Sequence, residues 1–336
     1  MMEGTPMTID STWLSVRQSA KVPRTPGGHA ETALRSKGAL YLFCTIRDYC
    51  VVIALLLSCT VQAAGTLDKV AQSGSISLGY RTTSLPLSYL DADKRPIGYS
   101  IDICQKIVEA VKRELNRRDI AVKFSEVSSA TRMNALIAGE IDLECGSSSV
   151  TAERLKLVSF STPTFITAVR MIVREGSGIK SISNLTKKTV VTTKGTTSEK
   201  LFNDLNQVRS LGSSFVLAKD HAESFAMLES GKADAFIMDD VLVYSLRASA
   251  KDPTQFTIAR DALSLEPIAI MLRKDDPAFS KVVDAEVNRL ITQGEMKAIY
   301  HKWFESPIPP SQINLNMPTS YMMNEHFKAP KSWQTY

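Results

Sequence analysis

Short apolar segments alternate with amphipathic segments in this sequence, and the alternation occurs in two successive series. In the first series, apolar residues recur with period two or in short runs at residues 75–81, 121–127 and 141–144, which predicts strands. Apolar residues recur at helical spacing in residues 101–115 and 132–138, which predicts amphipathic helices. This strand–helix–strand order predicts a mostly parallel sheet with right-handed crossovers, and therefore the α/β class.

A second α/β series follows, and two apolar runs connect it to the first. Its predicted strands and helices lie at residues 189–193, 198–205, 213–218, 223–228, 233–238, 241–250 and 256–258. Residues 165–173 contain neither Gly nor Pro, so they predict an extended strand between two lobes rather than a linker. Residues 265–272 predict a second crossing, after which helices at 277–291 and 295–304 pack on the first lobe. Two open lobes joined by two strands form a cleft, where ligands of such sheets bind.

Composition narrows the functional classes. The chain has 336 residues, of which 44% are hydrophobic and 22% charged, which excludes a disordered or coiled-coil protein. A formal charge of +5 without long basic runs argues against a nucleic-acid surface. Five Cys and four His without a CxxC or HxxxH pair argue against a structural zinc site. No GxxxxGK motif followed by Ser or Thr occurs, so the chain is not expected to supply energy from ATP.

Residues 1–64 are predicted to be a signal region with an upstream extension. The apolar residues 51–57, followed by a small-residue cleavage site at 61–63, are typical of a secretory signal. We favour simple cleavage over two alternatives, a short buried helix or strand and a lipid-attachment site at Cys59. Residues 1–46 do not fit a targeting segment, and a translation start placed too far upstream would account for them.

Two cysteines, Cys104 and Cys145, lie in the predicted mature chain. Export to an oxidising compartment permits a disulfide between them. Neither their number nor their spacing requires one, so two buried free thiols are the favoured interpretation.

Polar and charged side chains lie where the predicted strands end or the next helices begin. They are Arg81, Ser129, Arg132, Ser147, Ser149, Arg154, Thr196, Thr197, His221 and Asp239. Several have a plain structural alternative. Thr197 could be an ordinary N-cap, and Arg154 could be a solvated surface charge. His221 could be a loop residue, and Arg81 and Arg132 could lie over the sheet with their charges in solvent.

The set as a whole predicts a ligand with two carboxylates. One Arg with Ser147 and Ser149 suffices for an α-carboxylate, because each charge-assisted hydrogen bond contributes roughly 1.5–3 kcal/mol. Asp239 can accept a hydrogen bond from an α-ammonium. Two further Arg and one His would remain, and burying them unpaired is costly. A second carboxylate removes this surplus, so aspartate or glutamate is expected rather than a neutral or basic amino acid.

Several longer motifs match a known family. They are Gly79-Tyr80-Arg81, Gly98-Tyr99-Ser100, Glu144-Cys145-Gly146-Ser147, Gly195-Thr196-Thr197-Ser198-Glu199, Ala218-Lys219-Asp220-His221, Met238-Asp239-Asp240 and Pro307-Ile308-Pro309-Pro310. With them, residues 65–330 resemble the periplasmic glutamate/aspartate-binding proteins of bacterial ABC importers. The resemblance implies a two-lobed periplasmic-binding-protein fold of type II with two hinge strands. Lobe 1 would comprise residues 65–167 and 265–305, lobe 2 residues 168–264, and a surface-packed C-terminal tail residues 306–336.

The resemblance also implies roles for the candidate residues. The arginine matching Arg154, with Ser147 and Ser149, holds the α-carboxylate, and Asp239 holds the α-ammonium. The side-chain carboxylate is held by the remaining candidates, Arg81, Ser129, Arg132, Thr196, Thr197 and His221. Ser149 departs from the family pattern, because it replaces a threonine.

A non-enzymatic receptor is the implied function, with no catalytic residue, cofactor or metal. We expect a monomer in the periplasm that binds L-glutamate or L-aspartate and delivers it to the membrane subunits of an ABC permease, without nucleic acid. Some relatives carry a cysteine at the position of Ile270 as the partner of Cys145, and that disulfide cannot form here.

The competing class is an enzyme on the same fold. A small-carboxylate dehydratase would need a general acid or base in the cleft, for which His221, Asp239 and Glu144 are the candidates. A lytic transglycosylase is disfavoured, because no second catalytic domain follows residue 305.

Overall fold

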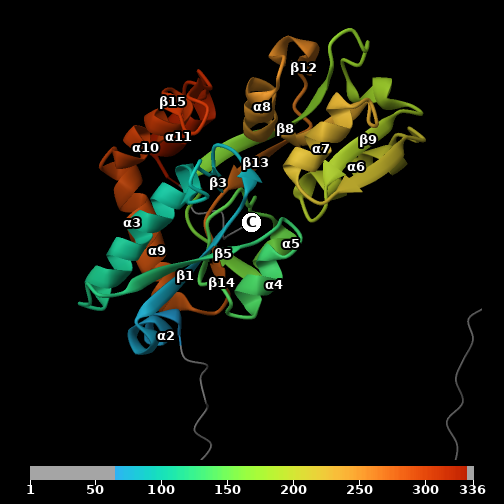
Figure 1. Ribbon diagram of the computed structural model, residues 1–336. Helices are drawn as coiled ribbons and strands as arrows, with labels where there is room; N and C mark the ends of the chain where they lie inside the picture. The colour runs from blue at the N-terminus through green and yellow to red at the C-terminus, as the bar shows by residue number, and fades with distance from the viewer. Residues whose placement is uncertain (1–64, 331–336) are drawn as a thin grey trace, which may run out of the picture. The chain divides into compact units, whose positions relative to one another are not determined.

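The computed structural model describes residues 65–330 (Figure 1). The predicted export signal and Cys59 lie outside these residues. Within them, no helix is long and apolar enough to cross a membrane. The described chain forms two mixed sheets, each covered by helices.

The first sheet has the strand order β5-β1-β6-β14-β7. Its strands are β1 (Ser75–Tyr80), β5 (Ala121–Glu126), β6 (Leu143–Glu144), β7 (Val158–Phe160) and β14 (Met271–Arg273). β1 pairs in parallel with β5 and β6, as the strand–helix alternation predicts, whereas β14 runs antiparallel to β6 and β7. A separate small sheet contains β2 (Thr83–Ser84), β3 (Ser88–Leu90) and β4 (Pro96–Ile97).

Within the described range, six helices accompany the first sheet. They are α2 (Thr66–Ser73), α3 (Tyr99–Glu114), α4 (Arg132–Ile137), α5 (Ala152–Leu155), α9 (Pro277–Thr292) and α10 (Glu295–Phe304). In α3, Ile103, Ile107 and Val111 recur every four residues and are fully buried, so one face of this helix supplies core contacts. α3 packs against α9, α10 and β1, which fixes its position over the sheet (Figure 1).

The second sheet has the order β10-β9-β11-β8-β12, with β13 paired to β8. Its strands are β8 (Phe165–Arg174), β9 (Thr189–Thr193), β10 (Ser214–Ala218), β11 (Ala235–Asp239), β12 (Phe256–Ile258) and β13 (Ser264–Ile268). The helices are α6 (Thr197–Val208), α7 (His221–Glu229) and α8 (Asp240–Ser249), with 3-10 turns at η1 (Ile182–Leu185) and η2 (Pro253–Gln255). All seven elements predicted for this series are present, with ends shifted by at most a few residues.

Two antiparallel segments join the two sheets. β8 pairs with β13 from Phe165 opposite Ile268 to Val169 opposite Ser264. The predicted single crossing at 265–272 is two strands, β13 and β14, because the chain leaves one sheet after Ile268 and enters the other at Met271. The lobe boundaries given by the sequence stay predictions.

The chain beyond α10 forms a hairpin of β15 (Pro307–Ile308) and β16 (Ile313–Asn314), followed by α11 (Tyr321–Lys328). Met323 and Phe327 of α11 are buried against the rest of the molecule. His326 Nε2 lies 2.7 Å from the carbonyl oxygen of Pro163, just before the joining strand β8. The last helix is therefore held against the junction between the sheets.

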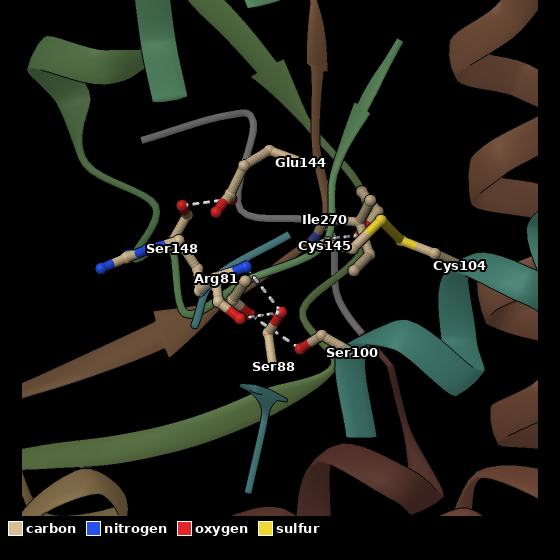
Figure 2. Close-up of a disulfide and its surroundings, with 10 residues drawn as sticks. Arg81, Ser88, Ser100, Cys104, Glu144, Cys145, Ser148 and Ile270 are labelled. Carbon is tan, nitrogen blue, oxygen red and sulfur yellow. Dashed lines mark hydrogen bonds between the residues drawn. A yellow bond between two sulfur atoms is a disulfide. The ribbon is translucent and has the colours of Figure 1, made fainter. Parts of the chain in front are cut away.

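Cys104 and Cys145 form a disulfide, so the favoured interpretation of two free thiols is wrong (Figure 2). The reason is tertiary: α3 packs over the sheet and brings the two Cα atoms to 6.2 Å, a distance that a disulfide spans. Ser100 Oγ on the same helix donates to the carbonyl of Gly146 at 2.7 Å. The polar loop after β6 is thus attached to α3 at two successive residues.

Removing this disulfide is expected to lower the free energy of unfolding. A Cys104→Ala variant, with Cys145 also changed to Ala to avoid a free thiol, should lose about 2–4 kcal/mol, because the bond closes a loop of 41 residues. Urea unfolding with and without reductant measures this. Reductant should destabilise the wild type and leave the double variant unchanged; an equal response in both proteins would contradict the prediction.

Candidate ligand-binding site

The polar loop after β6 and the short helix α5 carry Ser147, Ser149 and Arg154, the residues predicted to bind an α-carboxylate. Thr151 caps α5 by accepting from the Arg154 backbone N–H at 3.2 Å, which orients this helix. Arg154 Nη1 donates to the Ser149 carbonyl at 2.9 Å, and Nη2 donates to the Gly195 carbonyl at 3.3 Å. Arg154 is therefore partly buried between the elements of the two sheets and is not a solvated surface charge.

Arg81 and Arg132 form a buried cationic pair in the same region. Their exposed fractions are 1% and 2%, so the alternative in which their charges reach solvent is wrong. Arg132 Nη1 lies 3.3 Å from the Ser147 carbonyl and 3.8 Å from Glu144 Oε1. Arg81 follows β1, and its backbone N–H donates to Ser88 Oγ at 2.9 Å. Both side chains thus belong to the interior of the molecule.

The second sheet supplies hydroxyls and the imidazole. Thr196 caps α6, because its Oγ1 accepts from the backbone N–H of Glu199. Thr197, predicted as a possible N-cap, is instead the first helical residue, and its Oγ1 donates to Glu266 at 2.7 Å. His221 is fully buried at the start of α7, with Nδ1 2.8 Å from Thr193 Oγ1. It is therefore not a loop residue.

Unpaired polar atoms concentrate among the predicted site residues. Within the described residues, six buried side-chain polar atoms have no hydrogen-bond partner. Four belong to predicted site residues: Arg81 Nη1, Ser129 Oγ, His221 Nε2 and Asp239 Oδ1. Leaving such a group unpaired costs about 1–3 kcal/mol, and more when it is charged. A ligand carrying both anionic and cationic groups would satisfy atoms of these types.

Burial and neighbouring charges shift the pKa values of the candidate residues of both sheets. Burial and the neighbouring charge of Arg132 lower the pKa of Arg81 to about 9 and that of Arg154 to about 10. Burial, reinforced by Arg81 and Arg132, holds the pKa of His221 well below its ordinary value. Burial, reinforced by Glu266 and Asp240, raises the pKa of Asp239 well above its ordinary value. The site therefore holds an excess of buried cations, which favours an anionic ligand.

The two sheets approach each other closely beside these residues. Gly195 has φ +80°, and a Cβ there would lie 2.6 Å from the Ala130 Cα. Only glycine permits this backbone contact. A groove of about 440 Å³ lies next to it, lined by Arg154, Thr196 and Thr197 among others. A larger hollow of about 520 Å³ lies by α3 and β5, away from the charged cluster, so size alone does not identify the site.

The structure thus brings all ten predicted residues together around the facing ends of the two sheets. Sequence reasoning missed Thr193, which bonds His221, and Ser198, whose buried Oγ has no hydrogen-bond partner among residues 65–330. It considered Glu144 only as a possible catalytic group. Thr193 ends a predicted strand and Ser198 opens a predicted helix, so the rule that found the other residues could have included both.

The model of the bacterial extracellular solute-binding proteins, family 3, matches residues 76–306. The chain belongs to this family. The match spans both sheets and every predicted site residue. The two-lobed periplasmic-binding-protein fold expected from the sequence is confirmed, and the protein is a receptor of solutes rather than an enzyme.

This solute-binding protein is similar to curated relatives over most of its length. The L-glutamate/L-aspartate-binding protein of Pseudomonas aeruginosa is 44% identical over 283 residues, 83% of this chain and 94% of the relative. The glutamate/aspartate import solute-binding protein of Escherichia coli is 43% identical over 268 residues, 80% of this chain and 89% of the relative.

Solved structures of solute-binding proteins share the fold. The cysteine-binding protein of Campylobacter jejuni has a TM-score of 0.65 at 22% identity and covers 76% of this chain and 97% of its own. An ancestral arginine-binding protein bound to arginine has a TM-score of 0.63 at 25% identity and covers 69% of this chain and 98% of its own. These neighbours bind different amino acids, so the shared fold does not by itself identify the ligand.

Proposed function

We propose that this protein is a receptor that captures L-glutamate or L-aspartate and delivers it to the permease of an ABC importer. The observation that carries the proposal is the buried pair Arg81 and Arg132, which adds to Arg154 and exceeds the cationic charge that one α-carboxylate needs. The names of the relatives from P. aeruginosa and E. coli support the same ligand class.

Each part of the ligand has a suitable set of partners in this proposal. Arg154, with Ser147 and Ser149, binds the α-carboxylate, and Asp239 binds the α-ammonium, which stabilises the charged form of this carboxyl. The side-chain carboxylate lies among the remaining residues, Arg81, Ser129, Arg132, Thr196, Thr197 and His221. The unpaired atoms of Arg81, Ser129, His221 and Asp239 support these contacts.

Closure around the ligand provides the signal for delivery. Arg154 contacts both the loop after β6 and Gly195, so the ligand's α-carboxylate binds where the two lobes meet. A ligand that contacts both lobes stabilises the closed form relative to the open form. The protein acts as a periplasmic monomer, with the membrane subunits of the permease as its partner.

Calorimetry on the chain from residue 65 tests the ligand class. One-to-one binding of L-glutamate or L-aspartate is expected, with little response to L-glutamine or L-lysine. L-Glutamine has the shape of L-glutamate without the charge of its side chain, so it is the matched control for charge. Tight binding of glutamine without binding of either acidic amino acid would overturn the proposal.

A further inference from the structure

Glu144 is a fully buried carboxylate beside the site cations, and the proposed ligand contacts leave it without a role. Its Oε2 accepts a hydrogen bond from Ser148 Oγ (Figure 2). Its Oε1 has no hydrogen-bond partner within the described residues, although it lies 3.8 Å from Arg132 Nη1. An ionised oxygen in this position interacts with the guanidinium through charge, without a hydrogen bond.

Packing fixes the position of this oxygen. A Cβ on Gly146 would lie 2.2 Å from Glu144 Oε1 and 2.8 Å from Arg81 Cγ. The absence of a side chain at Gly146 therefore lets the carboxylate and the stem of Arg81 come together. The disulfide at Cys145 and the Ser100 hydrogen bond hold the same segment against α3. The charge of Glu144 is thus held near both buried arginines in this structure.

We propose that Glu144 is the internal counter-charge of the site, which compensates Arg81 and Arg132 in the ligand-free protein and thereby weakens the binding of acidic ligands. A ligand carboxylate that reaches these two arginines would lie near Glu144 and be repelled by it. This inference rests on the proposed function. It adds a residue, Glu144, that lowers the affinity for the acidic ligand without contacting it.

A Glu144→Gln variant tests the role of the charge. The amide oxygen can still accept from Ser148, so the change removes charge and conserves shape. The melting temperature without ligand should fall, because two buried guanidinium groups lose their counter-charge. The Kd for the acidic amino acid should fall at least about tenfold, whereas any binding of L-glutamine should change less than about threefold. An unchanged or weaker affinity for the acidic amino acid would overturn the inference.

Two further variants separate charge from stability. Glu144→Asp keeps the charge and should show no gain in affinity; a gain equal to that of E144Q would overturn the inference. Asp142→Asn removes another buried carboxylate, one that does not belong to the candidate site. Its Oδ1 lies 2.8 Å from Lys69 Nζ. It should lower the melting temperature without changing the Kd, and a tenfold gain here would also overturn the inference.

The inference can still be tested if E144Q does not fold in the absence of ligand. Refolding with L-glutamate or L-aspartate present should then recover the variant, because the ligand replaces the missing counter-charge, whereas L-glutamine should not. Equal recovery with both, or none with the acidic ligand, would overturn the inference. Failure of the proposed function is distinct: the wild type itself would then bind neither acidic amino acid.

Discussion

Replacing Arg154 by Ala is expected to abolish measurable binding of every amino acid, acidic or neutral. The guanidinium is the proposed partner of the α-carboxylate, which all amino acids share, and it also reaches Gly195. Two charge-assisted hydrogen bonds of roughly 1.5–3 kcal/mol each correspond to a Kd increase of about 10²–10⁴-fold. Calorimetry with L-glutamate and L-aspartate measures the loss.

Two arginine variants serve as controls for Arg154. Arg154→Lys keeps the charge but loses the planar fork, so it should recover only part of the affinity. Arg113 pairs with Glu286 at 2.8 Å on the outer side of α3 and is largely exposed, so Arg113→Ala should bind normally. Wild-type affinity in Arg154→Ala, with the protein folded, would show that another group binds the α-carboxylate.

Replacing Arg81 by Met is expected to remove the preference for acidic ligands. The Kd for glutamate or aspartate should rise about 10²-fold, while the Kd for any neutral amino acid that binds should change only a few-fold. The ligand-free protein should become more stable, because Met fills similar space and removes a buried guanidinium whose Nη1 has no hydrogen-bond partner in the described part of the chain. Competition binding and thermal unfolding report the two effects separately.

The conservative variant Arg81→Lys helps to interpret this result. It retains a cation and should keep part of the discrimination between acidic and neutral ligands. Equal losses of affinity for acidic and neutral ligands in Arg81→Met would contradict the division of roles between Arg81 and Arg154.

The sequence predicted those elements whose apolar residues repeat over several turns or a full strand. The strand at 256–258 and the helix at 295–304 have the predicted bounds, and α3 begins two residues and ends one residue before the predicted positions. The strands β2, β3 and β4 were missed: each has only two or three residues, and the prolines at 86 and 96 interrupt the segment that contains them. Residues 265–272 are divided into two strands because each half joins a different sheet. The pattern of apolar residues along the chain does not indicate which sheet a strand joins.

The clustering of the candidate site residues was predictable from the sequence, because the carboxyl ends of parallel strands lie at one edge of a sheet. Arg81 follows β1 of the first sheet and Asp239 ends β11 of the second, and both interact electrostatically with Arg132. The disulfide was not accessible, because the distance between Cys104 and Cys145 depends on how α3 packs. Glu144 was considered only as a catalytic group, because its unpaired oxygen near Arg132 appears only in three dimensions.

The contact of Gly195 with Ala130 bears on how long a captured molecule stays bound. The two backbones meet directly beside Ser129 and Thr196, with no side chain between them that could rotate aside. Separating the two segments therefore requires one backbone to move away from the other, a collective motion of microseconds to milliseconds rather than a rotamer change. For the ligand proposed above, a partner that separates these two segments would accelerate release without touching the ligand.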